Sequence, residues 1–287
     1  MLPAHRVAFG TMAKNVSADF VLRPFEGIPH EADLVALREV VPAATIAART
    51  TKEHGAKDVL LTTVLPAGWP ALHRADGVVL VALQAFAGAG DASRELAGVL
   101  LEAVALEPGT AVTATHPAAA DAPRLQDVLD LTGDFPVTMH ESFEYWLAAD
   151  VEVTPELRGA LDEANETLIP TERLESVPSA YWAHMGSRSY LRWAMPIDDD
   201  ALLDAVARLH ARRASAIGDA KFLGAFRSSG IVVPVWETTP GTELADLEKA
   251  VAAYAPTFEE ALASDAPLTS DERRARAGLV ARQVTLR

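Results

Sequence analysis

The chain of 287 residues contains no cysteine. This absence excludes disulfide bonds, thiol nucleophiles, thiolate zinc sites and iron–sulfur clusters. A reducing cytoplasm is the location that we expect for such a chain, and the sequence predicts neither a cofactor nor a metal.

Long hydrophobic runs are also missing. The longest apolar stretch, residues 77–90, is too short to cross a bilayer and is broken by glycines. The N-terminus carries His5 and Arg6 but no apolar core of signal-peptide length. Residues 1–18 show no periodicity, so we expect a disordered tail in which either Met1 or Met12 is the true start. No membrane association is expected.

Positive charge is scarce, because the formal net charge is −15. Such a charge repels polyanions and argues against nucleic acid as a partner. The exception is residues 269–287, which contain Arg273, Arg274 and Arg276. Thr269 and Glu272 have the spacing of a capping box, so a helix is expected to begin there. We favour docking of this helix on the acidic body through Leu279 and Val280, over binding to a partner or to nucleic acid.

The common catalytic motifs are absent. The sequence has no Gly-x-Ser-x-Gly elbow, no Gly-Lys-Ser/Thr phosphate loop and no His-Glu-x-x-His helix. Residues 88–93 (GAGDAS) follow a strand-like run and precede a helix-like run, as a dinucleotide loop would. The third glycine is missing, however, and Asp91 would place a carboxylate where the phosphate should lie. Asp91 and Asp198–Asp200 are therefore interpreted as charges that match the N-terminal end of a helix dipole.

The histidines show no spacing typical of a metal site. His140 and Glu141 lie on a probable strand, whose adjacent side chains point to opposite faces. His73 and His184 occupy similar places before two expected turns, where histidine is readily tolerated. No catalytic, cofactor-binding or metal-binding residue is predicted.

What the chain does have is the composition of an ordinary globular protein, 49% hydrophobic and 23% charged. Residues 29–131 and 155–262 share one order of elements: a helix that runs into a proline, a hairpin, a helix, a strand and a helix. Asp76-Gly77 and Gly186-Ser187 are dipeptides that favour tight hairpin turns. Thr154 before Pro155 is a typical helix start. A shared order that arose by chance is the alternative to an internal duplication.

We therefore predict an α+β fold with two pseudo-repeated halves. Its parts are a tail (1–18), a first α+β half (19–135), a second α+β half (136–266) and a C-terminal Arg-rich helix (267–287).

A candidate binding surface can be assembled from polar and aromatic residues in unusual places. Trp69 lies in the stiff loop Pro-Ala-Gly-Trp-Pro, whereas the other tryptophans lie in strand-like runs and are interpreted as core residues. Glu26, Arg38 and Glu39 mix charge into apolar runs of the first half, although a surface or interdomain salt bridge is the interpretation that we favour for them. The full set is Glu26, Arg38, Glu39, Trp69, Arg273, Arg274 and Arg276.

Three blocks carry a resemblance to a known family: residues 20–45 (FVLRPFEGIPHEADLVALREVVPAAT), 60–72 (LLTTVLPAGWPAL) and 273–287 (RRARAGLVARQVTLR). They resemble an uncharacterised actinobacterial family that is described only as a domain of unknown function. Many of its members carry an N-terminal SEC-C zinc motif and are therefore likened to SecA. This chain has no cysteine, so the implied zinc does not carry over. The resemblance implies a cytoplasmic protein and transfers no site residue.

Two functions remain open. The first is a non-catalytic binding or adaptor protein that holds a protein partner at the seam between its halves. The second is an enzyme of unrecognised type with a small-molecule pocket at the seam, using Glu26, Arg38, Glu39 and a histidine. Buried ionisable groups that converge in a deep pocket would favour the enzyme. A flat apolar patch with exposed tryptophan would favour the adaptor.

Overall fold

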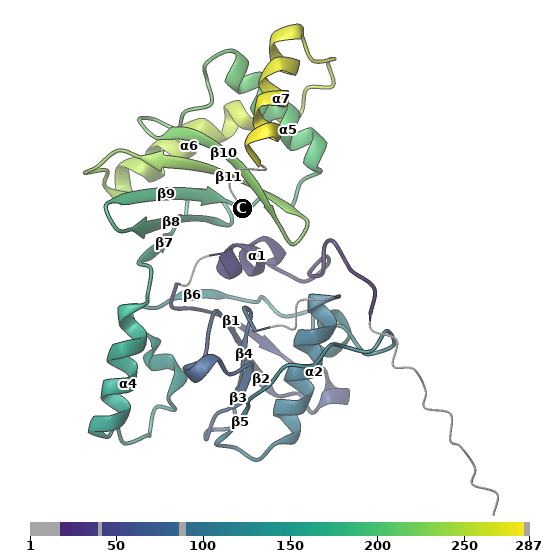
Figure 1. Ribbon diagram of the computed structural model, residues 1–287, viewed down its shortest axis with the longest axis vertical. Helices are drawn as coiled ribbons and strands as arrows, with labels where there is room; N and C mark the ends of the chain where they lie inside the picture. The colour runs from purple at the N-terminus through teal and green to yellow at the C-terminus, as the bar shows by residue number, and fades with distance from the viewer. Residues whose placement is uncertain (1–17, 40–41, 86–89, 284–287) are drawn as a thin grey trace, which may run out of the picture.

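The computed structural model describes residues 18–39, 42–85 and 90–283, and it confirms an α+β fold. The described residues form two sheets, one in each half of the chain, with helix α1 (Glu31–Glu39) lying between them (Figure 1). The expected tail lies outside the described residues except for Ala18, as do both candidate start residues and Gly88-Ala89 of the glycine-rich run.

The first sheet is mixed and has the strand order β5-β3-β4-β2-β1-β6. Only β2 and β4 pair in parallel. Its strands are β1 (Ala44–Arg49), β2 (Asp58–Thr62), β3 (Ala71–His73), β4 (Val79–Ala82), β5 (Thr110–Val112) and β6 (Val137–Met139).

Side chains of β4 alternate between two apolar layers, because successive strand residues point to opposite faces. Val79 and Val81 pack with helix α2 (Ala92–Ala105). Leu80 and Ala82 join a smaller cluster with the 3-10 helix η3 (Phe143–Trp146) and helix α4 (Pro155–Glu166). Short helices η1 (Lys52–His54), η2 (Pro66–Gly68) and α3 (Leu125–Val128) complete this half.

The second sheet is antiparallel throughout, with the order β10-β11-β9-β8-β7. Its strands are β7 (Thr171–Arg173), β8 (Ala180–Met185), β9 (Arg188–Trp193), β10 (Lys221–Ser228) and β11 (Ile231–Thr238). Helices α5 (Asp199–Ala211) and α6 (Leu244–Leu262) cover one face. Trp182, Trp193 and Trp236 fill the core on that face.

Helix α1 is buried from both sides, which explains how the two halves are joined. Every residue from Glu31 to Leu37 is buried. One apolar cluster contains Leu34 and Leu37 of α1, residues of the first sheet, and Tyr181, Ile231 and Val233 of the second sheet. A single core therefore runs through the seam, which is the region where α1 and the segment before it meet the second sheet.

The local signals of the sequence are confirmed. Met185 pairs with Arg188 around Gly186-Ser187, and His73 pairs with Val79 around the turn that contains Asp76-Gly77. Side-chain oxygens of Asp91, Thr154 and Asp198 accept backbone hydrogen bonds at the starts of α2, α4 and α5.

The internal repeat is not confirmed. The strand after α2 (β5) pairs with β3, the first strand of its hairpin, whereas β11 after α5 pairs with β9, the second strand of its hairpin. The parallel β2–β4 pair has no counterpart in the second sheet. The two halves share part of their element order but differ in how their strands pair.

The C-terminal helix α7 (Ser270–Gln283) docks on α5, as expected (Figure 1). Thr269 and Glu272 form the predicted capping box. Leu279 is buried, and Arg276 forms ion pairs with Asp200 and, at 2.6 Å, Asp204. The expected role of Val280 as an anchor is wrong, because its side chain is 41% exposed. In the part of the chain that is described, no helix is long and apolar enough to cross a bilayer.

Candidate functional site

A cleft of about 750 Å³ lies at the seam. Its walls come from the start of α1 and the residues before it (27–33), the segment that leads into β8 (177–179), the end of β9 with the residues after it (193–197), and α6. We call this the seam cleft. Most of its lining is apolar, with Ile28, Val177, Trp193, Met195, Ile197, Phe258 and Leu262. The rings of Trp193 and Phe258 lie 5.8 Å apart between centroids.

A buried carboxylate, that of Asp33, organises the polar end of the seam cleft. The side chain of Asp33 is 1% exposed. Its Oδ1 accepts a short hydrogen bond from the Tyr181 hydroxyl and lies 3.5 Å from Nε of Arg173. Its Oδ2 lies 2.9 Å from Nδ1 of His30. A buried charge is tolerated when it is paired and hydrogen-bonded in this way.

His30 places one ring nitrogen toward Asp33 and leaves the other without a partner. The carboxylate accepts the proton of Nδ1, so the neutral ring carries its lone pair on Nε2. Nε2 makes no hydrogen bond to any residue that the structure describes. The side chain lines the seam cleft and is 38% exposed, so Nε2 is open to a ligand.

The backbone of His30 is held in an uncommon conformation. Its φ of 58° lies in the left-handed region, which few residues other than glycine adopt. The carbonyl of His30 accepts from the amide of Leu34, so His30 stands immediately before the first turn of α1. The local cost of this conformation is offset by the contact between His30 and Asp33 one turn later.

Tyr181 acts as a fixed donor. Burial raises the pKa of its hydroxyl far above the ordinary value, and the negative charge of Asp33 raises it further. The phenol therefore stays protonated at any pH at which the protein functions. Its proton remains available to Asp33, and Tyr181 ties α1 to β8.

A second ion pair shapes the rim of the seam cleft. Arg23 donates from Nε and Nη2 to the two carboxylate oxygens of Glu31, at 2.6 and 2.8 Å. This geometry is bidentate, the strongest arrangement of a guanidinium and a carboxylate. The pair ties the segment before α1 to the first turn of the helix.

Ser179 is the hydroxyl residue of the seam cleft. It is 4% exposed, and its φ is 54°. Its carbonyl accepts from the amide of Ala194, which fixes the turn before β8. Its hydroxyl makes no hydrogen bond within the described ranges, although it lies two residues before Tyr181 and in the same cleft as His30. Because Ser179 lines the seam cleft, its hydroxyl is a candidate for chemistry there.

The seven residues predicted as a binding surface do not form one surface. Glu26 is exposed and lies 3.5 Å from Arg23, outside the lining of the seam cleft. Arg38 and Glu39 lie at the opposite end of α1 from His30. Arg38 donates to Ser229 Oγ at 3.2 Å and stacks over Phe25, and burial lowers its pKa. The carbonyl of Glu39 accepts from Arg192 at 3.3 Å.

Trp69 and the three arginines lie elsewhere. Trp69 is half-buried against the cluster that contains Phe143 and Trp146. Arg273 donates to the carbonyl of Leu268, and Arg274 lies 3.0 Å from Asp271 within α7. The other four tryptophans, Trp146, Trp182, Trp193 and Trp236, are buried, which agrees with their interpretation as core residues.

Sequence reasoning missed His30, Asp33, Ser179 and Tyr181. One signal was available: in Pro-His-Glu-Ala-Asp, His30 and Asp33 stand three residues apart at a helix start, where side chains of that spacing meet. Nothing local connects them to Ser179 or Tyr181, because the Asp33–Tyr181 contact spans 148 residues of chain.

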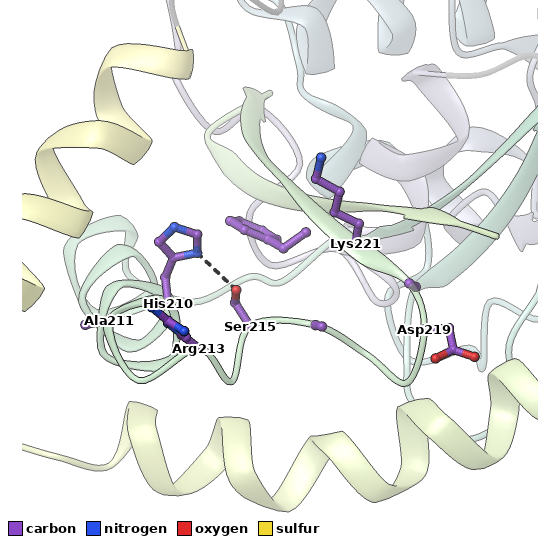
Figure 2. Close-up of a pocket in the computed structure, with 9 residues that line it drawn as sticks. His210, Ala211, Arg213, Ser215, Asp219 and Lys221 are labelled. Atoms are coloured by element: carbon purple, nitrogen blue, oxygen red, sulfur yellow. Dashed lines mark hydrogen bonds between the residues drawn. The ribbon is translucent and has the colours of Figure 1, made fainter.

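A second pocket, of about 540 Å³, lies between the end of α5 and the start of β10 (Figure 2). Nδ1 of His210 lies 3.0 Å from Oγ of Ser215. Figure 2 shows Asp219 at the far end of the connecting loop, well away from this pair. Among the residues that the structure describes, no carboxylate pairs with the His210 ring, whereas Asp33 pairs with the ring of His30 in the seam cleft.

The described ranges contain no group of three or more His, Cys, Asp or Glu side chains placed to hold a metal ion. Residues 24–287 match the model of one protein family, which is described as a family of unknown function (DUF5926). No curated protein and no solved structure matches the chain.

Proposed function

The chain belongs to the family of unknown function DUF5926, and we propose from the seam cleft that it binds a small molecule between its two halves. The resemblance stated from the sequence is thereby confirmed at the level of the family. Because that family has no known activity, the proposal is supported by geometry alone.

The proposal rests on one observation: the lining of the seam cleft is mainly apolar and carries a polar group at one end. Small-molecule sites are concave and mainly apolar, with a few polar groups that fix the orientation of the ligand. Trp193, Met195 and Phe258 supply an apolar wall, and His30 supplies the polar end. We infer a ligand with an apolar body, aromatic or branched, and one hydrogen-bonding group that meets Nε2 of His30.

Binding to a protein partner stays a prediction, and the contacts of the described residues do not favour it. An adaptor would be favoured by exposed tryptophans, but each tryptophan is buried or half-buried. The buried ionisable groups that converge around Asp33 instead favour the second function, in which a small molecule enters a pocket at the seam. A cytoplasmic location and an actinobacterial distribution of the family also stay predictions.

A fluorescence titration tests the proposal. The probe is N-phenyl-1-naphthylamine, a neutral apolar fluorophore whose emission rises when it leaves water. We expect saturable binding of one probe per chain. Ala255 lines the seam cleft, so Ala255→Trp should fill it and weaken binding at least about tenfold, or about 1.4 kcal/mol.

The matched control is Ala252→Trp. Ala252 lies one turn earlier on α6 and is exposed, so the same substitution adds the same ring outside the cleft. Equal affinities of the two variants would show that the probe binds elsewhere and would reject the proposal. Thermal melts of both variants establish that each is folded.

A further inference from the structure

We propose that the seam cleft hydrolyses a carboxylic ester with an apolar acyl group, using Ser179 as nucleophile, His30 as general base and Asp33 as the residue that positions His30. This inference rests on the proposed binding function and assigns a reaction to the same site. The reaction needs no metal and no redox partner.

The His30–Asp33 pair has the properties of a general base with its orienting carboxylate. In serine hydrolases, the carboxylate holds the imidazole in the tautomer whose Nε2 accepts a proton, and it stabilises the imidazolium that then forms. Asp33 meets Nδ1 of His30 at 2.9 Å, which selects the same tautomer. Tyr181 and Arg173 hold Asp33 in turn, so the carboxylate cannot rotate away.

Ser179 has the properties of a nucleophile. Its side chain is buried in the lining of the seam cleft, and its hydroxyl has no partner in the described part of the chain. The left-handed backbone at φ 54° is of the strained kind that clusters at active sites. The structure has no hydrogen bond between Ser179 and His30. Catalytic hydrogen bonds are often long before substrate binds, and we expect this one to form in the substrate complex.

The proton and electron pairs balance over two steps. Oγ of Ser179 attacks the carbonyl carbon of the ester while Nε2 of His30 takes the hydroxyl proton. The bond between the carbonyl carbon and the alcohol oxygen breaks, and the leaving alcohol takes that proton from His30. Water then attacks the acyl-serine ester and gives its proton to His30, which returns it to Ser179 as the carboxylic acid leaves.

The start of α1 offers a place for the developing oxyanion. The first amides of a helix have no intrahelical acceptor, and Ala32 and Asp33 at the start of α1 are among the residues that line the seam cleft. Backbone N–H groups at such a position stabilise negative charge in the transition state. The apolar wall of Trp193, Met195 and Phe258 would hold the acyl chain and sets the preference for an apolar ester.

The test is covalent labelling of the full chain with a fluorophosphonate probe, followed by intact mass and peptide mapping. We expect one adduct, on Ser179, and hydrolysis of p-nitrophenyl butyrate. Ser179→Gly should abolish both, and glycine tolerates the positive φ at this position. His30→Ala should slow labelling by about a hundredfold or more. Ser176→Ala, which changes an exposed serine three residues earlier, should label like the wild type.

Absence of labelling, or labelling that survives Ser179→Gly, would overturn the inference. A labelling rate unchanged by His30→Ala in a folded protein would also overturn it, because the base would then have no role. If the fluorophore binds in the seam cleft but no serine is labelled, the chain is a binding protein without this activity. If the fluorophore does not bind there either, the binding proposal fails as well.

Discussion

The side chain of Asp33, in the first half, contacts two residues of the second half, Tyr181 and Arg173. The sequence predicts the helix that contains it, because apolar residues recur at helical spacing from Leu34 onward. An acidic residue in the first turn of a helix is ordinarily a surface charge. Only the tertiary structure shows that this one is buried against Tyr181 and Arg173. Sequence reasoning therefore did not find the candidate site, and Glu26, one of the charges that it favoured instead, is exposed.

The hydroxyl of Tyr181 makes stability depend on alkaline pH. Its pKa is raised by burial and by Asp33, whereas tyrosine in the unfolded chain ionises near pH 10. The raised pKa therefore contributes stability that is fully present below about pH 10 and is lost as the pH rises above it. We expect the free energy of unfolding of the wild type to fall as the pH rises from about 9 to about 11. It should fall less steeply in Tyr181→Phe, which lacks the ionisable hydroxyl.

The control is Tyr190→Phe, which removes a hydroxyl from a half-buried position on the neighbouring strand. Denaturant unfolding at a series of pH values measures the difference between the two variants. Tyr181→Phe should also cost about 1–3 kcal/mol at neutral pH, because Asp33 loses a buried donor. Parallel pH profiles of Tyr181→Phe and the wild type would contradict this account of the seam.

At the scale of single elements, helix α7 shows which features the local sequence predicts and which it does not. The Thr269–Glu272 capping box is a short-range signal and was predicted correctly. Which of two adjacent apolar residues faces the body depends on how the helix is rotated against α5, and capping does not set that rotation. Leu279 is buried and Val280 is 41% exposed, although the sequence alone predicts both as anchors of the helix.

We predict that Leu279→Ala lowers the free energy of unfolding by about 2–4 kcal/mol, because it removes a buried side chain from the α5–α7 contact. Val280→Ala, at the next residue, should cost less than about 0.5 kcal/mol. The difference should persist in 1 M salt. The Debye length is then about 3 Å, so the salt screens the ion pair between Arg276 and Asp204 and leaves the apolar contact. Equal effects, or loss of the difference in high salt, would mean that charge rather than apolar contact holds α7.

At the scale of the whole molecule, hairpins and helices could be predicted but the sheets could not. The turn dipeptides fix two hairpins because both strands lie within a few residues of each turn. The parallel β2–β4 pair and the β1–β6 pair join strands that do not follow one another in the chain, and no local pattern specifies such partners. The expected repeat shows the same limit, since a similar order of elements led to different strand orders.

The central claim is that one ligand site is shared by the two halves at the seam. The most direct measurement is hydrogen–deuterium exchange of the full chain with and without saturating N-phenyl-1-naphthylamine. Slower exchange is predicted together in residues 27–33 of the first half and in residues 193–197 and 255–262 of the second half, because each of these segments contributes residues to the lining of the seam cleft. Protection confined to one half, or centred on residues 210–222 around the second pocket, would contradict the claim.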